Sequence, residues 1–379
     1  MLSVQFIISF SLIILLCLQI NPSELLFCPN KCYCDNSEMV DCEGAPFEQV
    51  PNILQTKVRI LRIKNSSISI IQKGAFKRYT DLKELIIENC DQLHTIEKFA
   101  FKGLSRLKLL RLANNPTLNN IAKNAFSQIT NRHGLRIQLI NNSFTRIRQG
   151  LFRQLNHLRE FTLQGENLKI EVNAFASFTQ VDFFNLFGVI SFGLRSFENT
   201  SRIHRLEISH SQFSITAGVF TALSHIREIH IISNEIDTID TEAFTGLYTI
   251  GSLIITDNKI GNISGYAFAT IVNIGEIIIE RNTIRNLETE ALISEAWQIR
   301  FQDNILYCSC AINWLNYINN SVLLKKNFCG AEEFHRSLLN YKPKCLRPKR
   351  GLSATIITRT RHFIIIFCLF IVMFYHKTI

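Results

Sequence analysis

One pattern of apolar residues recurs along most of the sequence. The segments IREIHIISNEIDTIDTEAF (Ile226–Phe244) and IGSLIITDNKIGNISGYAF (Ile250–Phe268) both carry alternating apolar residues, then an Asn, then a Phe ten residues after that Asn. Successive copies of the Asn-type position are 22 to 27 residues apart, and so steady a period predicts a solenoid of stacked coils. The Asn-type positions are Ser66, Cys90, Asn115, Asn142, Glu166, Val189, Ser211, Asn234, Asn258, Asn282 and Asn304.

The consensus L-x-x-L-x-L-x-x-N-x-L at this period is typical of the leucine-rich repeat. Within its x-L-x-L part, successive side chains point to opposite faces of a short strand. We therefore expect Ile229 and Ile231 to face the core, and Glu228 and His230 to face outward. The predicted fold is an α/β solenoid, a leucine-rich repeat horseshoe of about eleven repeats with a concave parallel β-sheet and disulfide-bonded caps at both ends.

Phenylalanine is abundant, with 29 copies in 379 residues, and the repeat explains a third of them. Nine occupy the same place in successive repeats, where coil-to-coil stacking builds an aromatic spine of the core, not a ligand cage. The repeat is least regular in the segment 180–197, QVDFFNLFGVISFGLRSF, where Val189 replaces the Asn. The spine residues are Phe76, Phe101, Phe126, Phe152, Phe175, Phe197, Phe220, Phe244 and Phe268.

Eight cysteines lie at the two ends of the repeats, four at each end. A solenoid exposes apolar core at both ends, so we expect disulfide-bonded caps there, with Trp314 and Leu315 covering the last coil. Four cysteines allow three pairings. Zinc binding by these thiolates is the alternative, although no matching His pair accompanies them. Cys90, in a repeat, is interpreted as a buried thiol, with a reactive thiol as the alternative. The cap cysteines are Cys28, Cys32, Cys34 and Cys42, then Cys308, Cys310, Cys329 and Cys345.

Both chain termini carry apolar segments. Residues 1–20, MLSVQFIISFSLIILLCLQI, match the apolar part of a secretory signal peptide, with a retained anchor as the alternative. The run FIIIFCLFIVMFY (363–375) is shorter than the roughly 20 residues of a spanning helix, so a GPI signal is favoured over a short single span or neither. The predicted organisation is a signal peptide at 1–20, an N-terminal cysteine-rich cap at 28–57, leucine-rich repeats at 58–303, a C-terminal cap at 304–346, a basic stalk at 347–362 and a hydrophobic anchor or GPI signal at 363–379.

The formal net charge of +10 is concentrated near the C-terminus. Without the eight cations from Lys342 onward, 33 basic residues remain against 31 acidic ones, a difference of +2. A nearly neutral repeat region argues against nucleic-acid binding. The eight cations are Lys342, Lys344, Arg347, Lys349, Arg350, Arg359, Arg361 and Lys377.

The motifs CPNKCYC, the in-phase repeats and CSCAINWLNY together resemble one family, the animal extracellular leucine-rich repeat proteins with cysteine-rich flanking caps, including membrane-tethered receptors and adhesion proteins. The resemblance covers roughly Cys28 to Cys345. It implies a curved solenoid and protein recognition outside the cell. It also implies four cap disulfides, Cys28–Cys34, Cys32–Cys42, Cys308–Cys329 and Cys310–Cys345.

The sequence offers no pattern for an enzyme, a cofactor or a metal. HIREIH (His225–His230) lies along an expected strand and is not a zinc-protease motif, and neither a nucleophile elbow nor a phosphate-binding loop occurs. Binding of an extracellular protein ligand or surface co-receptor on the concave face is therefore the predicted function. For Phe183 and Phe187 the alternative is repair of core packing. The candidate ligand-binding residues are Arg62, Lys108, Arg111, Arg136, Phe183, Phe187, His204, Arg205, Glu228 and His230.

Five N-x-S sequons support passage through the secretory pathway. We expect a glycoprotein on the extracellular side of the plasma membrane, tethered by its C-terminal segment. The alternative is a secreted matrix or decoy protein. The predicted N-glycosylation sites are Asn65, Asn141, Asn199, Asn262 and Asn319.

Overall fold

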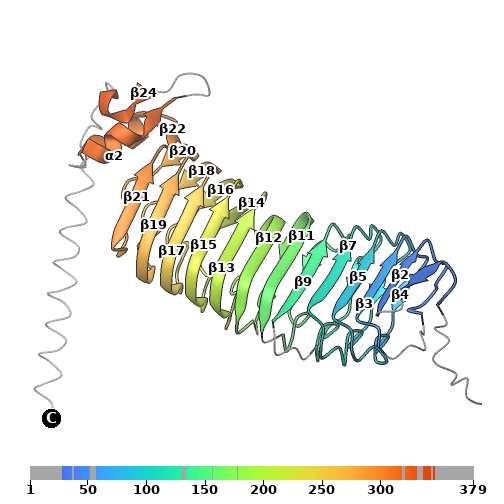
Figure 1. Cartoon of the computed structure of the whole chain (residues 1–379). Coiled ribbons are helices and arrows are strands. Elements are labelled where there is room, and N and C mark those ends of the chain that lie inside the picture. The colour runs from blue at the N-terminus through green and yellow to red at the C-terminus, as the bar shows by residue number, and fades with distance from the viewer. Residues whose placement is uncertain are drawn as a thin grey trace, which may run out of the picture. The chain divides into compact units, whose positions relative to one another are not determined.

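The structure is a computed structural model, and residues up to Tyr341 form one compact unit in it. It describes residues 28–35, 38–51, 57–129, 134–155, 157–176, 178–317, 321–330, 336–342 and 345. The predicted signal peptide, basic stalk, C-terminal anchor and sequon Asn319 lie outside the described residues. Successive coils stack side by side along one long sheet (Figure 1).

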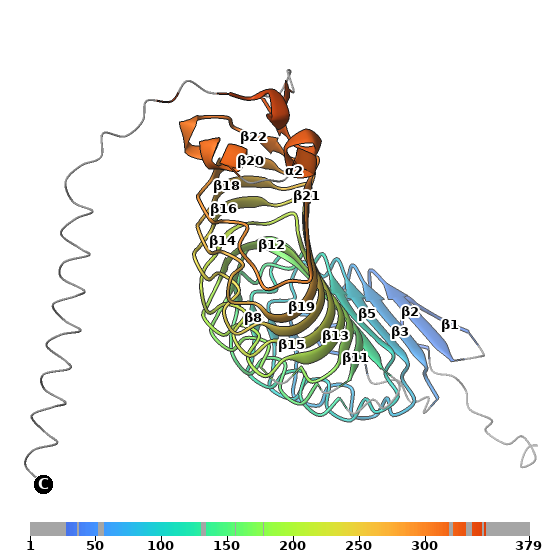
Figure 2. The ribbon, with the colours of Figure 1, turned by 90° about the vertical axis from the view of Figure 1, so that its left-hand side faces the viewer.

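The long sheet has 14 strands, and apart from the antiparallel pair at its start they run parallel. The order follows the chain, because each coil contributes one strand beside that of the preceding coil. Figure 2 shows the coils turned by 90°, with the return segments looping away from these strands. The strands are β1 (Cys32–Cys34), β2 (Met39–Glu43), β3 (Ile60–Lys64), β5 (Glu84–Glu88), β7 (Leu109–Ala113), β9 (Leu135–Ile140), β11 (Leu158–Ile170), β12 (Val181–Phe192), β13 (Ser201–Ser209), β15 (Ser224–Ile232), β17 (Tyr248–Thr256), β19 (Val272–Glu280) and β21 (Gln298–Gln302), with β10 (Arg146–Ile147) beside β11.

Alternation along each strand separates core from surface. Ile229 and Ile231 are buried and pair in register with Ile255 and its neighbours on β17, while Glu228 and His230 face outward, as the sequence predicts. The nine spine phenylalanines are buried, and neighbouring rings stack with centroids 5.3 to 6.2 Å apart. The solenoid fold is therefore confirmed.

The return segments form two shorter sheets, which are parallel except for the last pair of the second sheet, β23 and β24. The first joins three two-residue strands of the early coils, and the second joins seven strands of the later coils. Among the described residues the repeats contain turns but no α-helix, so the helical part of the predicted α/β label is confined to the C-terminal cap. The strands are β4 (Ile70–Ile71), β6 (Thr95–Ile96) and β8 (Asn120–Ile121), then β14 (Gln212–Ile215), β16 (Glu235–Ile239), β18 (Lys259–Ile263), β20 (Thr283–Leu287), β22 (Ile305–Leu306), β23 (Phe328–Cys329) and β24 (Arg336–Ser337).

A buried ladder of asparagines joins the later coils. The backbone N–H and the Nδ2 of Asn234 both donate to Oδ1 of Asn258, at 2.9 and 3.1 Å, and Asn258 donates to Asn282 in the same way. The ladder continues through Asn304 to Asn327, which sequence analysis did not include. These amides satisfy backbone groups that the coils would otherwise bury unpaired.

In the earlier coils the ladder is irregular, because Cys90 occupies one of the Asn-type positions. Cys90 is fully buried, and its Sγ lies 3.4 Å from the carbonyl oxygen of Glu88. Burial raises the pKa of the Cys90 thiol, more than a hydrogen bond from the Ser66 backbone lowers it. Cys90 is thus a buried structural thiol, as predicted.

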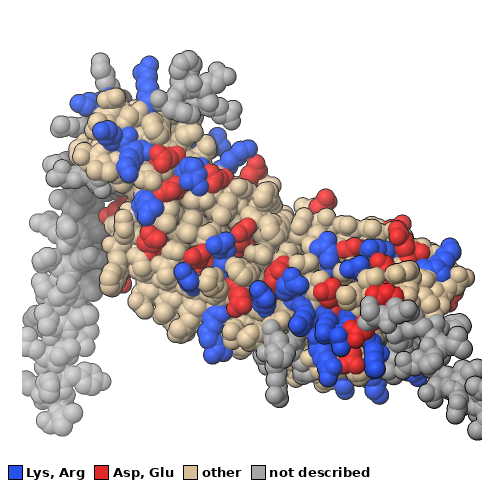
Figure 3. Space-filling view, viewed as in Figure 1, with Lys and Arg blue, Asp and Glu red and all other residues tan. Residues whose placement is uncertain are grey.

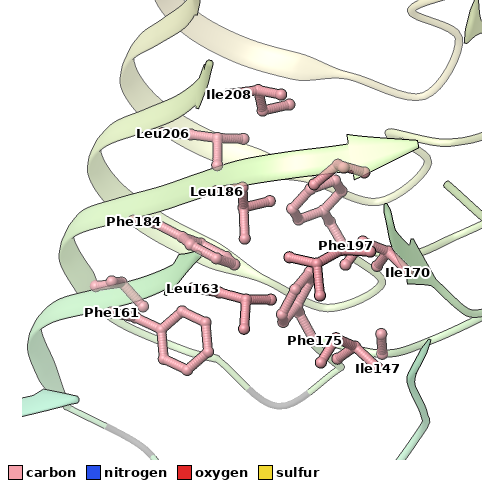
Figure 4. Close-up of a cluster of buried hydrophobic side chains, with 14 of the residues drawn as sticks. Ile147, Phe161, Leu163, Ile170, Phe175, Phe184, Leu186, Phe197, Leu206 and Ile208 are labelled. Atoms are coloured by element: carbon pink, nitrogen blue, oxygen red, sulfur yellow. The ribbon is translucent and has the colours of Figure 1, made fainter. Parts of the chain in front are cut away.

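In the middle of the solenoid the observed strand register differs from the alignment of repeats made from the sequence. Gln164 pairs with Phe187 but Leu168 pairs with Val189, so β11 holds two extra residues there. Glu166 is exposed, and the buried counterpart of Val189 is Leu168, not Glu166. A Cβ on Gly188 would lie 1.8 Å from the carbonyl oxygen of Gly165, so this close approach requires glycine. Phenylalanines and leucines fill the core beneath the irregular strands (Figure 4).

Cysteine caps close both ends of the described repeats. The disulfides Cys28–Cys34, Cys32–Cys42 and Cys308–Cys329 are those that the family resemblance implies. Cys310 and Cys345 are also disulfide-bonded. In the C-terminal cap the Nε1 of Trp314 donates to the Leu287 carbonyl oxygen at 3.2 Å, and Leu315 is buried, so this segment covers the last coil. The cap elements are η1 (Cys310–Tyr317), α2 (Ser321–Lys326) and η2 (Leu338–Asn340).

Candidate functional site

The candidate site is the outer face of the long sheet, which we call the concave face. Each parallel strand presents three outward side chains, and the register aligns these in three rows across the sheet. The predicted binding residues fall on this face or at its edge. Arg136, Phe183, Arg205 and Glu228 lie in the first row, Arg62, Arg111 and His230 in the middle row, and Phe187 in the third. Lys108 directly precedes β7, and His204 lies within β13 directly before Arg205.

A chain of hydrogen bonds crosses the concave face between β5 and β12. Arg111 forms an ion pair with Glu88, and its Nη1 donates to Oε1 of Gln138 at 3.0 Å. Gln138 in turn donates to Oε1 of Glu160 at 2.8 Å, and Thr162 donates to the same oxygen at 3.0 Å. Arg111 is therefore held within the sheet surface and is not a free cation.

A second polar cluster joins β13 and β15. Nε and Nη2 of Arg205 each lie 3.2 Å from Oε2 of Glu228, and Nε2 of His230 lies 3.0 Å from the same oxygen. Partial burial acts to raise the pKa of Glu228, but the hydrogen bonds from His230 and Arg205 outweigh it, so this pKa lies below its ordinary value. Glu228 is thereby kept ionised.

The two phenylalanines of the irregular segment occupy different environments. Phe183 is 42% exposed on the concave face, and its ring lies 5.8 Å from the His204 ring. Its sequence neighbour Phe184 is the residue buried in the core, against Phe161 and Phe175. Phe184, and not Phe183, therefore fills the core in this irregular segment. Phe187 is half-buried, with its ring 6.3 Å from His210.

A cleft of about 430 Å³ opens where the strands β7 to β12 begin. It brings together three predicted residues, Lys108, Arg136 and Phe183. Figure 3 shows basic side chains gathered along this edge of the sheet. The remaining lining residues are Gly134, Arg159 and Glu160.

Sequence analysis did not assign those three lining residues, nor Gln138 and Thr162. The alternation in LREFTLQ (158–164) could have placed Glu160 and Thr162 outward, because Phe161 and Leu163 are apolar. The extra residues of β11 disturb the repeat, and this irregularity hid the outward positions of the strand from the sequence pattern.

Beyond His230 the middle row of the concave face becomes apolar. Ile254 and Ile278 follow it in the middle row, and both are half-buried. Charges return at the end of the sheet, where Arg300 lies 3.4 Å from Glu276 and 3.7 Å from Glu280. Arg62, at the opposite end, lies 3.6 Å from Asp41.

Of the described sequons, Asn65 and Asn141 lie away from the basic cleft, whereas Asn199 lies just before the start of β13. Asn65 and Asn141 directly follow the ends of β3 and β9, whereas the cleft lies where strands begin. Asn65, Asn141 and Asn199 are exposed. Asn262 is half-buried, and its Nδ2 donates to Oε1 of Glu288 at 2.9 Å.

Within the described ranges, no group of three or more His, Cys, Asp or Glu residues could hold a metal ion. In the same ranges, no helix has both the length and the apolar character needed to cross a membrane.

The chain matches a known family and is similar to many solved structures, among them the following two. Residues 69–192 and 190–305 match the family described as BspA type leucine rich repeat region, in six copies. A chain of the octameric complex of Latrophilin 3, Unc5D and FLRT2 (LRR) is 20% identical with a TM-score of 0.54, over 80% of this chain and 92% of that one. Human 5T4 (Wnt-activated inhibitory factor 1, trophoblast glycoprotein) is 20% identical with a TM-score of 0.40, over 57% of this chain and 84% of that one.

Proposed function

This chain belongs to the BspA-type leucine-rich repeat family, and from that premise we propose that it is an extracellular recognition module that binds a protein ligand on its concave face. The observation that carries the proposal is Phe183, a large aromatic side chain left 42% exposed on a strand whose neighbouring Phe184 is buried. Aromatic residues and arginines are enriched among residues that dominate binding energy at protein interfaces.

The scaffold supports such a role because the core and the surface are specified separately. The buried asparagines and the phenylalanine spine hold successive coils together, so the outward positions of the strands keep a fixed spacing. A surface that is ordered before binding loses little conformational entropy on association. The concave face is therefore suited to rigid, complementary binding.

Disulfides at both ends of the repeats favour an oxidising compartment. We propose cell-surface tethering through residues 363–379, with residues 347–362 as a stalk. The alternative is a secreted matrix or decoy protein. Treating intact cells with phosphatidylinositol-specific phospholipase C separates them: release supports a GPI anchor, retention supports a spanning segment, and constitutive appearance in the medium supports the alternative.

The recognition proposal is tested by screening soluble extracellular domains against cells that display the full chain. We expect at least one partner whose binding Phe183→Ala weakens about tenfold, the order expected of an interface hot spot. Tyr317→Ala is the matched control, because Tyr317 is 82% exposed but lies in the C-terminal cap, away from the concave face. Partners that bind both variants equally well would place recognition elsewhere.

A further inference from the structure

We propose that the basic cleft at the start of β7 to β12 binds an acidic segment of the protein partner, with carboxylates on Lys108, Arg136 and Arg159 and an apolar side chain against Phe183. This inference rests on the proposed recognition function and adds the chemistry of the ligand to it.

The three cations of the cleft lack the compensation that other cations of the concave face have. Arg62, Arg111, Arg205 and Arg300 all form ion pairs with carboxylates. Among the described residues, the side chains of Lys108, Arg136 and Arg159 form no ion pair and no hydrogen bond. Three positive charges therefore share this cleft with one carboxylate, that of Glu160.

Glu160 forms no ion pair with Arg136, and one of its oxygens accepts hydrogen bonds from two uncharged side chains. Arg136 and Glu160 are register partners on adjacent strands. The Oε1 of Glu160 nevertheless accepts from Gln138 and Thr162, and no ion pair with Arg136 forms. The hydrogen bonds from Gln138 and Thr162 thus orient the Glu160 carboxylate, and the guanidinium of Arg136 remains available to a ligand.

The position of the cleft also suits a partner that lies along the concave face. Gly134, whose missing side chain leaves room beside Arg159, lies among the cations, and the exposed ring of Phe183 lines the same cleft. Sequons Asn65 and Asn141 follow strand ends, so their glycans would stand at the opposite edge of the sheet. A compact cleft with an aromatic wall fits a short acidic peptide loop better than a long sulfated glycan, which would need a continuous basic track.

The test uses the full chain, purified from a secretory expression host, and three fluorescent peptides. The peptide Glu-Glu-Phe-Glu-Glu is the probe, and its Gln-Gln-Phe-Gln-Gln and Glu-Glu-Ala-Glu-Glu relatives separate charge from the aromatic contact. Of the three peptides, we expect only the probe to bind strongly enough to measure. The triple variant Lys108→Gln, Arg136→Gln, Arg159→Gln should weaken its binding about tenfold at 0.15 M salt. The control variant Lys77→Gln, Lys102→Gln, Lys325→Gln removes the same charge from exposed positions off the sheet, and should change the affinity less than about twofold.

Several results would overturn the inference. Equal weakening by both triple variants would reduce it to general charge attraction, and no peptide binding would remove it. Binding of a heparin hexasaccharide, but not of the probe, that is lost only in the cleft variant would replace the acidic peptide with a sulfated glycan. If a partner found in the surface screen depends on Phe183 but not on the three cations, recognition on the concave face stands and the acidic ligand fails.

Discussion

The early coils, residues 58–155, and the late coils, residues 201–306, build the same core with different return arms. In the early coils the return arm carries two-residue strands, β4, β6 and β8. In the late coils β14, β16, β18 and β20 have four or five residues each and form a continuous parallel sheet. Each late coil is thus hydrogen-bonded to its neighbours on two sides of the core.

The sequence cause is visible immediately after the Asn-type residue. In the late coils the next residue donates its N–H to the preceding coil, as Lys259 does to the carbonyl oxygen of Asn234 at 2.9 Å and Thr283 to that of Asn258 at 2.9 Å. In the early coils Ser67 still donates to the Ala45 carbonyl oxygen at 3.4 Å, but in the coil of Asn115 the next residue is Pro116, which has no N–H to donate. An extra residue after Cys90 and after Asn115 also shifts the following apolar positions.

The concave face, in contrast, is more varied in the earlier part of the chain than in the late coils. The long polar network and the cleft lie on the early coils and on residues 157–192 that follow them, while the late coils place Ile254 and Ile278 in the same row. Regular internal bonding and a varied surface are therefore separated along one chain. The proposed recognition site therefore lies on the early coils and on residues 157–192, whereas the regular asparagine ladder lies in the late coils.

The largest expected effect tests what both regions share. Phe220→Ala removes a buried ring stacked between Phe197 at 5.6 Å and Phe244 at 5.5 Å, and should lower the free energy of unfolding by about 4 kcal/mol. Phe126→Ala should cost about the same, because its ring stacks at 5.3 and 5.4 Å. Urea denaturation measures both, and a large difference between them would mean that the spine does not act equally in the two regions.

A smaller effect should distinguish the regions. Asn258 takes part in five side-chain hydrogen bonds, so Asn258→Ala should cost about 3 kcal/mol, since buried partners remain unsatisfied. Asn142 takes part in three, so Asn142→Ala should cost about 2 kcal/mol. Denaturant midpoints measure the order, and a reversed order would contradict a stronger ladder in the late coils.

Glu228→Gln tests the charged cluster that precedes the isoleucine face. Its lowered pKa in the fold means that the carboxylate stabilises the protein above its unfolded value of about 4.3, and that this contribution is lost as pH falls through the folded pKa. We expect a loss of about 1 kcal/mol at pH 7, because the Arg205 partner is partly exposed to solvent. Thermal unfolding at pH 7 and at successively lower pH should show the difference from wild type shrink below the unfolded pKa and vanish below the folded pKa.

Glu235→Gln is the control for that substitution. Glu235 pairs with Lys259 at 3.4 Å, but both side chains are well exposed. The control should therefore change stability by no more than a few tenths of a kcal/mol at any of these pH values. A pH-dependent loss as large as that of Glu228→Gln would show that the effect belongs to surface charge in general.

The smallest effect would make an early coil resemble a late one. Cys90→Asn puts an amide where the sulfur accepts from the Ser66 backbone and lies 4.0 Å from the Ile63 carbonyl oxygen. The new rung should raise stability by up to about 1 kcal/mol. Cys90→Ala is the control and should destabilise. If Cys90→Asn destabilises as much as Cys90→Ala, the early coils are not limited by their missing rung.

The sequence predicted those features that repeat in every coil. The inward positions and the phenylalanine spine recur with the same physical reason, so one good copy, such as Ile226–Phe244, reveals the others. The cysteine caps were expected from their place at the two ends of the repeats, and their pairing from the family resemblance. Asn327 follows Asn304 by 23 residues and could have been found by spacing, but its segment lacks the preceding apolar alternation.

The candidate site was predicted only in part, because it depends on contacts between strands. Lys108, Arg136 and Phe183 were placed on the correct face, but their meeting in one cleft follows from the register of β7, β9, β11 and β12. The extra residues in β11 conceal that register. The sequence also could not reveal that Glu88 holds Arg111 while Arg136 stays unpaired, since this depends on side-chain geometry.

The asparagine ladder has a direction. Every rung from Asn234 to Asn304 donates to the following rung and accepts from the one before, and Asn327 in the C-terminal cap receives the last pair of bonds. Each late coil therefore presents the same pair of hydrogen-bond donors to the following coil and the same amide oxygen acceptor to the preceding one. Deleting or duplicating the 24 residues from Glu235 to Asn258 would leave matching ends, so this chain could change length by whole coils while its terminal seals stay intact.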